Sequence, residues 1–260
     1  MVATPVHALT SAEIDAAWNF DDPVASEQRF RAERARWPAG TREALEIDTQ
    51  IARTLGLQRR FADANALLDG VVASSWAVPP RVDLRFLLER GRVANSSGAP
   101  AQATVYFREA LSRSADDRLP DGAFYRIDAL HMLGIAAPQA ERVDWNRRAL
   151  AASEAAAEPR ARGWRASILN NLGWSLLDAG DATGALDAWQ QALAASEASG
   201  DVARTRVAKW TVARGLRANG RLDEAERMQR QLAAELARAG ETDPFVDEEL
   251  AEIAKAKAAR

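Results

Sequence analysis

The chain has 260 residues and a formal net charge of -3 at pH 7, and it contains no cysteine. These values exclude disulfides and thiol catalysis, and the slight acidity argues against nucleic-acid binding through bulk positive charge. Hydrophobic residues make up 47% of the chain, too many for a disordered protein. No apolar stretch approaches the roughly 20 residues that span a membrane, and residues 1–10 lack the features of a signal peptide. We therefore expect a soluble, cytoplasmic protein, and the abundance of Ala and Arg favours a bacterial origin.

The first predicted element is a helical hairpin over residues 11–37. Its break falls at Asp22-Pro23, because proline is tolerated at the first position of a helix and aspartate is a preferred cap before it. We expect Asp21 or Asp22 to cap the second helix.

About five repeated units are predicted over residues 41–240. The hexapeptide Ala-Leu-Ala-Ala-Ser-Glu occurs at 149–154 and again at 192–197, and the second copy closes the clearest unit. Matching positions recur at a spacing near forty residues, which predicts pairs of long antiparallel helices. The middle unit is irregular: its first helix or turn is about four residues short and ends near Pro138. The clearest unit is marked by Leu169, Leu172, Gly173, Leu176, Gly180, Ala185, Trp189 and Ala192.

Small residues recur at one position of the first helix in every unit. Glycine inside a helix costs roughly 1 kcal/mol relative to alanine, so its recurrence indicates close packing against the partner helix. Further glycines are expected at the turns between helices, where the backbone needs an unusual angle. The small positions are Ala52, Gly91, Gly134, Gly173 and Ala213, and the turn glycines are Gly98, Gly180 and Gly220.

The last predicted element is a helix over residues 244–259. Phe245, Leu250 and Ile253 are expected on one side of it, with charged residues elsewhere. This pattern is typical of the polar helix that closes the end of a helical repeat array.

The repeat pattern resembles the tetratricopeptide repeat, and most of the chain resembles stand-alone bacterial tetratricopeptide proteins without an assigned activity. The resemblance implies an all-α fold, a single right-handed superhelix over residues 1–260, and binding of proteins or peptides in a concave groove lined by the first helices. Carried over position by position, it puts Thr49 and Leu88 on that wall. The predicted binding residues are Arg53, Arg85, Arg92, Asn95, His131, Asn170, Asn171, Trp174, Arg206, Trp210, Arg214 and Arg217.

Guanidinium groups bind carboxylates in two-point contacts, so the arginines favour a peptide or protein with acidic groups or a free C-terminus. The alternative is that Glu46, Glu89 and Asp128 pair with the arginines and leave a solvated, salt-bridged surface. The lysine–asparagine clamp of chaperone-binding members is not reproduced, because Thr49 and Arg53 occupy the corresponding first-unit positions.

No motif for a catalytic nucleophile or a phosphate loop is found, and two histidines cannot form a histidine metal cluster. We therefore expect a non-catalytic protein without cofactor or metal. A peptide-sensing receptor is an alternative, and an RNA-binding helical repeat is disfavoured by the net charge. The sequence does not identify the partner, the pathway or the oligomeric state.

Overall fold

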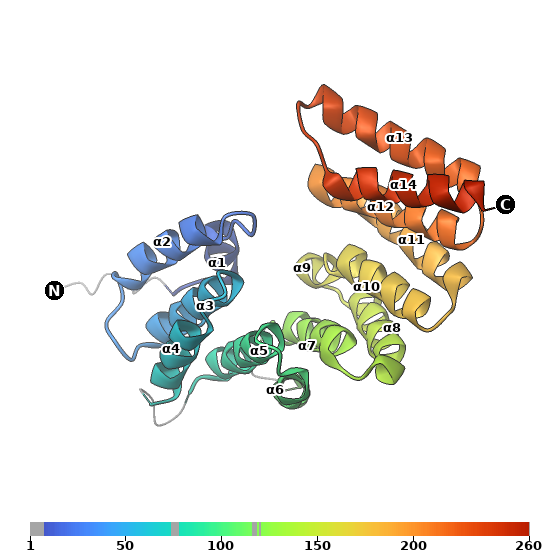
Figure 1. Cartoon of the computed structure of the whole chain (residues 1–260). Coiled ribbons are helices and arrows are strands. Elements are labelled where there is room, and N and C mark those ends of the chain that lie inside the picture. The colour runs from blue at the N-terminus through green and yellow to red at the C-terminus, as the bar shows by residue number, and fades with distance from the viewer. Residues whose placement is uncertain (1–7, 74–77, 116–118, 120, 260) are drawn as a thin grey trace. The chain divides into compact units, whose positions relative to one another are not determined.

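The structure is a computed structural model that describes residues 8–73, 78–115, 119 and 121–259. These residues form helices and their connections, without a strand among them, and Figure 1 shows long helices lying side by side in antiparallel pairs. The helices are α1 (Ser11–Ala17), α2 (Pro23–Arg34), α3 (Arg42–Leu57), α4 (Phe61–Ala73), α5 (Pro80–Ser96), α6 (Pro100–Arg113), α7 (Gly122–Ala136), α8 (Gln139–Ala155), α9 (Pro159–Arg162), α10 (Arg165–Asp178), α11 (Ala182–Ser199), α12 (Val202–Ala218), α13 (Leu222–Arg238) and α14 (Pro244–Ala258).

The chain divides into two compact units, residues 1–132 and 133–260, and the boundary falls within α7. The all-α fold of repeated helix pairs is confirmed. The organisation of the whole chain as one domain stays a prediction. Among the described helices none is long and apolar enough to cross a membrane. Of residues 1–10, where a signal peptide was not expected, residues 1–7 lie outside the described part.

The first unit is built around α3, which packs against α2, α4 and α5, while α5 packs against α6. Its apolar core includes Phe30, Ile51, Leu55 and Leu68, all nearly inaccessible to water. The helical hairpin at 11–37 is present as α1 and α2, and the Asp22 side chain accepts a hydrogen bond from the Ala25 amide, as a cap should. The predicted break at Asp22-Pro23 is therefore confirmed.

In the second unit, each helix from α10 to α13 packs against the next one along the chain. α10 packs against α8 and α11, α11 against α12, and α12 against α13, with α14 covering both α12 and α13. Trp189 of α11 lies at the centre of this unit and is fully buried, together with Leu172, Leu216 and Ile253. The helices of 14 to 18 residues account for the long repeat period.

The recurring small residues have the predicted role. A Cβ atom added to Gly91 would overlap the ring of Phe107, and one added to Gly173 would overlap the indole of Trp189. The turn glycines Gly98 and Gly180 have φ of +91° and +86°, which side chains rarely tolerate. The same turn in the first repeat is made by Arg59 at φ +62°, which the sequence pattern does not reveal.

The C-terminal helix differs from the prediction in which residues it buries. Phe245 is 60% exposed and Val246 is buried in its place, whereas Ile253 is buried and Leu250 packs against the core as predicted. Glu249 is 2% exposed and accepts hydrogen bonds from Arg217, so not every charged residue of this helix lies on its solvent-exposed side. The charge is buried because arginines of α12 lie opposite it.

Candidate binding surfaces

The inner wall predicted for the first unit is largely covered. Thr49 and Leu88 are 0% and 1% exposed, so the expectation that they line an open groove is wrong. Arg85 and His131 are buried as well, at 5% and 9% exposed. These positions do share one face of α3, α5 and α7, as the repeat frame predicts, but that face is not open to solvent.

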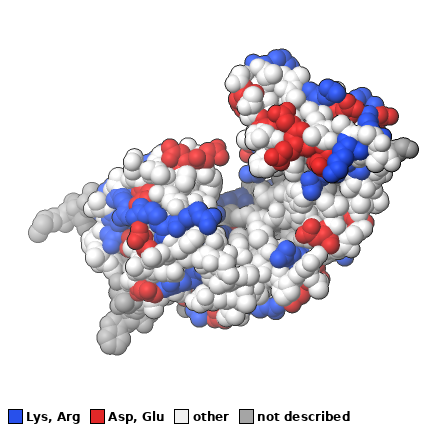
Figure 2. All heavy atoms as spheres, in the orientation of Figure 1, with Lys and Arg blue, Asp and Glu red and all other residues white. Residues whose placement is uncertain are grey.

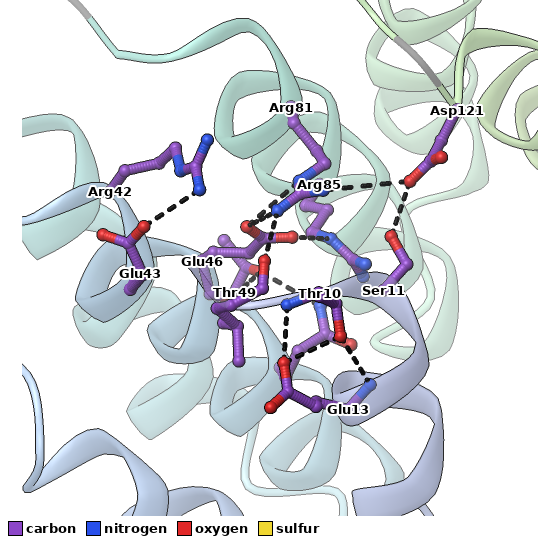
Figure 3. Close-up of polar contacts among 12 residues, drawn as sticks. Thr10, Ser11, Glu13, Arg42, Glu43, Glu46, Thr49, Arg81, Arg85 and Asp121 are labelled. Carbon is purple, nitrogen blue, oxygen red and sulfur yellow. Dashed lines mark hydrogen bonds and ion pairs between the residues drawn. The ribbon is translucent and has the colours of Figure 1, made fainter. Parts of the chain in front are cut away.

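The cover is the chain's own N-terminal segment, residues 8–18. The segment is ordered by a capping box in which the Thr10 and Glu13 side chains each bind the backbone amide of the other residue. Figure 3 shows Thr10 and Ser11 of this segment beside Glu46 of α3 and Arg85 of α5. The Leu9 carbonyl accepts a hydrogen bond from Arg81 at 3.1 Å. Further along, the Trp18 indole donates to Gln50 at 3.1 Å.

A buried ion-pair network lies under this segment. Both oxygens of Glu46, which is fully buried, accept hydrogen bonds: Oε1 from Arg85 at 3.0 Å and Oε2 from Arg81 at 2.7 Å (Figure 3). Nearby, Arg92 donates to Glu89 at 2.7 Å and also to Asp128. These arginines are therefore paired with Glu46, Glu89 and Asp128, as the alternative prediction held, but the three carboxylates are buried rather than solvated.

His131 belongs to the same network and is held neutral. Burial lowers the pKa of His131 to about 4, although the neighbouring Asp128 opposes the shift. Burial alone would raise the pKa of Asp128, but Arg92 outweighs that effect and lowers it. The network thus keeps Asp128 charged and His131 uncharged at neutral pH.

This arrangement predicts a pH dependence of stability. Between pH 6.5 and about 4 the unfolded chain protonates His131 and the folded chain does not, so stability falls as the pH falls through that window. From pH 7 to pH 5 we expect the native protein to lose about 2 kcal/mol more than a His131→Gln variant, at ~1.4 kcal/mol per pKa unit. Urea unfolding of both proteins at the two pH values measures this difference, and equal losses would show that His131 does not titrate in this way.

In the second unit, the predicted residues of α10 and α12 form a face that is only partly covered. Trp174 and Trp210 are half-buried, with ring centroids 6.0 Å apart and planes inclined by 35°. The Arg214 guanidinium carbon lies 5.1 Å and 5.7 Å from the two ring centroids, within range of a cation–π contact with each. We call this surface the α10–α12 face; it comprises Asn170, Asn171, Trp174, Arg206, Trp210, Arg214, Arg217 and Phe245.

Packing from behind holds the α10–α12 face in position. Trp174 stands edge-on to the buried Trp189, with centroids 5.2 Å apart, and Trp189 donates a hydrogen bond to the Asn170 carbonyl at 3.1 Å. The Trp210 indole donates to the Phe245 carbonyl at 2.8 Å, which places the exposed Phe245 ring 6.3 Å from Trp210. The aromatic rings therefore continue from α10 across α12 to the start of α14.

The arginines of the α10–α12 face are also paired, but less completely. Arg214 and Arg217 both donate to Glu249, and Arg206 donates to Glu241 at 2.6 Å. These three arginines donate to two carboxylates, and Glu252 adds a further negative charge near Arg217. The Nε of Arg214 is buried and has no hydrogen-bond partner among the described residues.

The charged surface carries no extended basic region on the side drawn in Figure 2, where acidic and basic side chains lie next to one another in both units. Within the described part of the chain, no three acidic or histidine side chains cluster closely enough to hold a metal ion. The predicted residues therefore gather in two places, the buried network with Arg53, Arg85, Arg92 and His131, and the α10–α12 face. Asn95 lies beside the first, at the edge of a cavity.

A family model of the tetratricopeptide repeat matches residues 165–199, which form α10 and α11. The search of curated proteins found no match to the chain.

Solved structures support the same fold over nearly the whole chain. The crystal structure of BtubC (BKLC) from P. vanneervenii is 16% identical with a TM-score of 0.65, covering 91% of this chain and 95% of that one. A putative kinesin light chain with nearly identical TPR-like repeats from Podospora anserina is 18% identical with a TM-score of 0.61, covering 78% and 99%. A signal-transduction ATPase with a tetratricopeptide-repeat sensor from Pyrococcus horikoshii is 12% identical with a TM-score of 0.69, and the match covers 93% of this chain and 36% of that protein. By its matched repeat and its structural neighbours, the chain is a protein of the tetratricopeptide-repeat fold.

Proposed function

We propose that the chain is a non-catalytic binding protein that holds an extended peptide segment of a partner on the α10–α12 face. The observation that carries the proposal is the half-buried pair Trp174 and Trp210 with Arg214 between them. Tryptophan and arginine dominate the binding energy of protein interfaces, because they combine large apolar area with directed polar contacts. Repeat proteins of this fold typically bind proteins.

The first unit is a poorer candidate for peptide binding. Its inner face is already filled by residues 8–18, and Glu46, Thr49 and Leu88 are inaccessible to water. On the α10–α12 face the corresponding positions are at least partly exposed, and Arg214 retains 34% of its side-chain exposure. A peptide can therefore reach these side chains without a rearrangement of the helices.

The chemistry of the face suggests what the peptide contains. Apolar side chains would contact the rings of Trp174, Trp210 and Phe245. A carboxylate of the peptide would meet the charge of Arg214, which its single 3.3 Å hydrogen bond to Glu249 compensates only weakly. We propose a segment with an aromatic or aliphatic residue next to an acidic residue. A ligand-controlled receptor would use the same contacts and differ only in a subsequent output.

The proposal is tested with peptides selected from a random displayed library on the immobilised protein. For the selected peptide, Trp210→Ala is expected to weaken binding by at least 30-fold, which corresponds to about 2 kcal/mol, and Arg214→Gln by about tenfold. Arg204→Gln is the matched control, because Arg204 lies on the same helix and is exposed, paired only with Asp201 one turn away. Isothermal titration calorimetry gives the affinities.

Two outcomes contradict the proposal. One is a selected peptide that binds the Trp210→Ala and Arg214→Gln variants as tightly as the native protein. The other is a library that yields no peptide above background. Circular dichroism and the thermal midpoint confirm that each variant is folded.

A further inference from the structure

A cavity of about 230 Å³ lies between α3 and α5 in the first unit, separate from the α10–α12 face. Its lining combines charged groups with an aliphatic wall: the lining residues used here are Arg53, Gly56, Glu89, Val93, Asn95 and Met132. At roughly 30 Å³ per water molecule, the volume corresponds to about eight waters. The cavity is therefore of the size of one small molecule, and too small for a peptide segment.

Glu89 lines this cavity and has one carboxylate oxygen without a hydrogen-bond partner among the described residues. The residue is 2% exposed, and its Oε1 accepts a hydrogen bond from Arg92 at 2.7 Å. Its other oxygen, Oε2, is buried and has no hydrogen-bond partner among the described residues. A buried carboxylate oxygen without a partner costs about 1–3 kcal/mol or more, so a donor that reaches this carboxylate from the cavity would offset part of that cost.

Arg53 supplies unused donors beside it. Among the described residues its guanidinium makes no hydrogen bond, and the nearest carboxylate oxygen, Oε1 of Glu89, is 3.8 Å away. The guanidinium carbon of Arg53 lies instead 5.4 Å and 5.2 Å from the ring centroids of Trp18 and Phe20. Burial, and after it the like charge of Arg92, lower the pKa of Arg53 to about 10, although Glu89 and Asp128 oppose the shift.

The charges around the cavity decide which ligand fits. Two guanidinium groups, of Arg53 and Arg92, stand against two carboxylates, of Glu89 and Asp128, so the group is neutral overall. A simple anion would gain contact with Arg53 but would be repelled by Glu89. A ligand with both charges close together meets a donor and an acceptor at once.

We propose that this cavity binds a free α-amino acid with an aliphatic side chain. The carboxylate of the ligand pairs with the Arg53 guanidinium, with the Asn95 amide beside it, and the ammonium donates to the Glu89 carboxylate. A guanidinium nitrogen of Arg53 lies 3.8 Å from Oε1 of Glu89, so the two partners lie close together, as do the two charged groups of the ligand, which are attached to one carbon atom. Val93 and Met132, which line the cavity, then contact the side chain. The proposal is independent of peptide binding, because it uses residues of the other unit.

Three probes separate the two charges of the ligand. L-leucine carries both, N-acetyl-L-leucine lacks the ammonium, and L-leucinamide lacks the carboxylate. By isothermal titration calorimetry with the full chain at pH 7, L-leucine is expected to bind and each of the other two to bind at least tenfold more weakly. Absence of L-leucine binding up to 10 mM, or equal binding of N-acetyl-L-leucine, overturns the proposal.

A variant that fills the cavity tests its location without changing a charge. Gly56 lies inside α3 at a negative φ, and a Cβ there would meet Val93 only at an ordinary 3.5 Å, so Gly56→Leu is expected to fold and to exclude the ligand. Gly70→Leu is the matched control, because Gly70 is exposed on α4 with open space around it. Arg53→Met should likewise reduce L-leucine binding at least tenfold. Native-like L-leucine binding by a folded Gly56→Leu variant would contradict the assigned site.

Discussion

Replacing Glu46 with alanine is expected to lower the free energy of unfolding by about 3–5 kcal/mol. The side chain is fully buried and accepts hydrogen bonds from Arg81 and from Arg85, which is itself 5% exposed. Without this carboxylate, the Arg85 guanidinium remains buried with its charge uncompensated. Urea unfolding followed by circular dichroism measures the loss.

The matched control is Glu43→Ala, one turn earlier on the same helix. Glu43 pairs with Arg42, whose side chain is 42% exposed, so its removal is expected to cost no more than about 1 kcal/mol. A similar small effect for Glu46→Ala would mean that water reaches Arg85 in solution and that residues 8–18 do not cover it.

The second large effect is expected at the centre of the second unit. Trp189 is fully buried, and its replacement by alanine should cost about 3–5 kcal/mol through the cavity left behind. Gly173 is a glycine only because this indole lies against it. We therefore expect Gly173→Ala to destabilise the native protein by about 1–3 kcal/mol, through overlap of the new methyl group with the indole.

The two substitutions should be strongly coupled. Once Trp189 is alanine, the overlap is gone, and Gly173→Ala should stabilise that background by up to about 1 kcal/mol, the ordinary preference of a helix interior for alanine over glycine. A double-mutant cycle from four unfolding curves gives the coupling. If Gly173→Ala destabilised both backgrounds equally, close packing against Trp189 would not explain the glycine.

The repeat frame predicted the core better than the surface, for a physical reason. Close packing restricts residue type, so the glycines at positions 91 and 173 indicate in the sequence that a bulky side chain packs against them. The turn at Arg59 escapes the pattern because a strained φ at a non-glycine residue leaves no mark on residue type. The short helix α9 also escaped prediction, since four residues show no periodicity.

The accessibility of the binding residues could be predicted only in part. The resemblance to the tetratricopeptide repeat put Thr49 and Leu88 on the inner side of their helices, but it cannot show that residues 8–18 return across α3 and α5 or that both side chains are buried. It likewise cannot show which acidic residue approaches which arginine, because Glu249 and Arg217 are more than thirty positions apart. Trp174 and Trp210, which the repeat positions put outside the core, are half-buried, and Trp174 also packs edge-on against the buried Trp189.

The most direct test of the proposed function follows the tryptophan indole N–H resonances in an NMR titration with a selected peptide. The resonances of Trp174, Trp189 and Trp210 are assigned from single Trp→Phe variants. Peptide binding on the α10–α12 face predicts large shifts for the indoles of Trp174 and Trp210. Shifts confined to tryptophans of the first unit, with Trp174 and Trp210 unchanged at saturation, would contradict it.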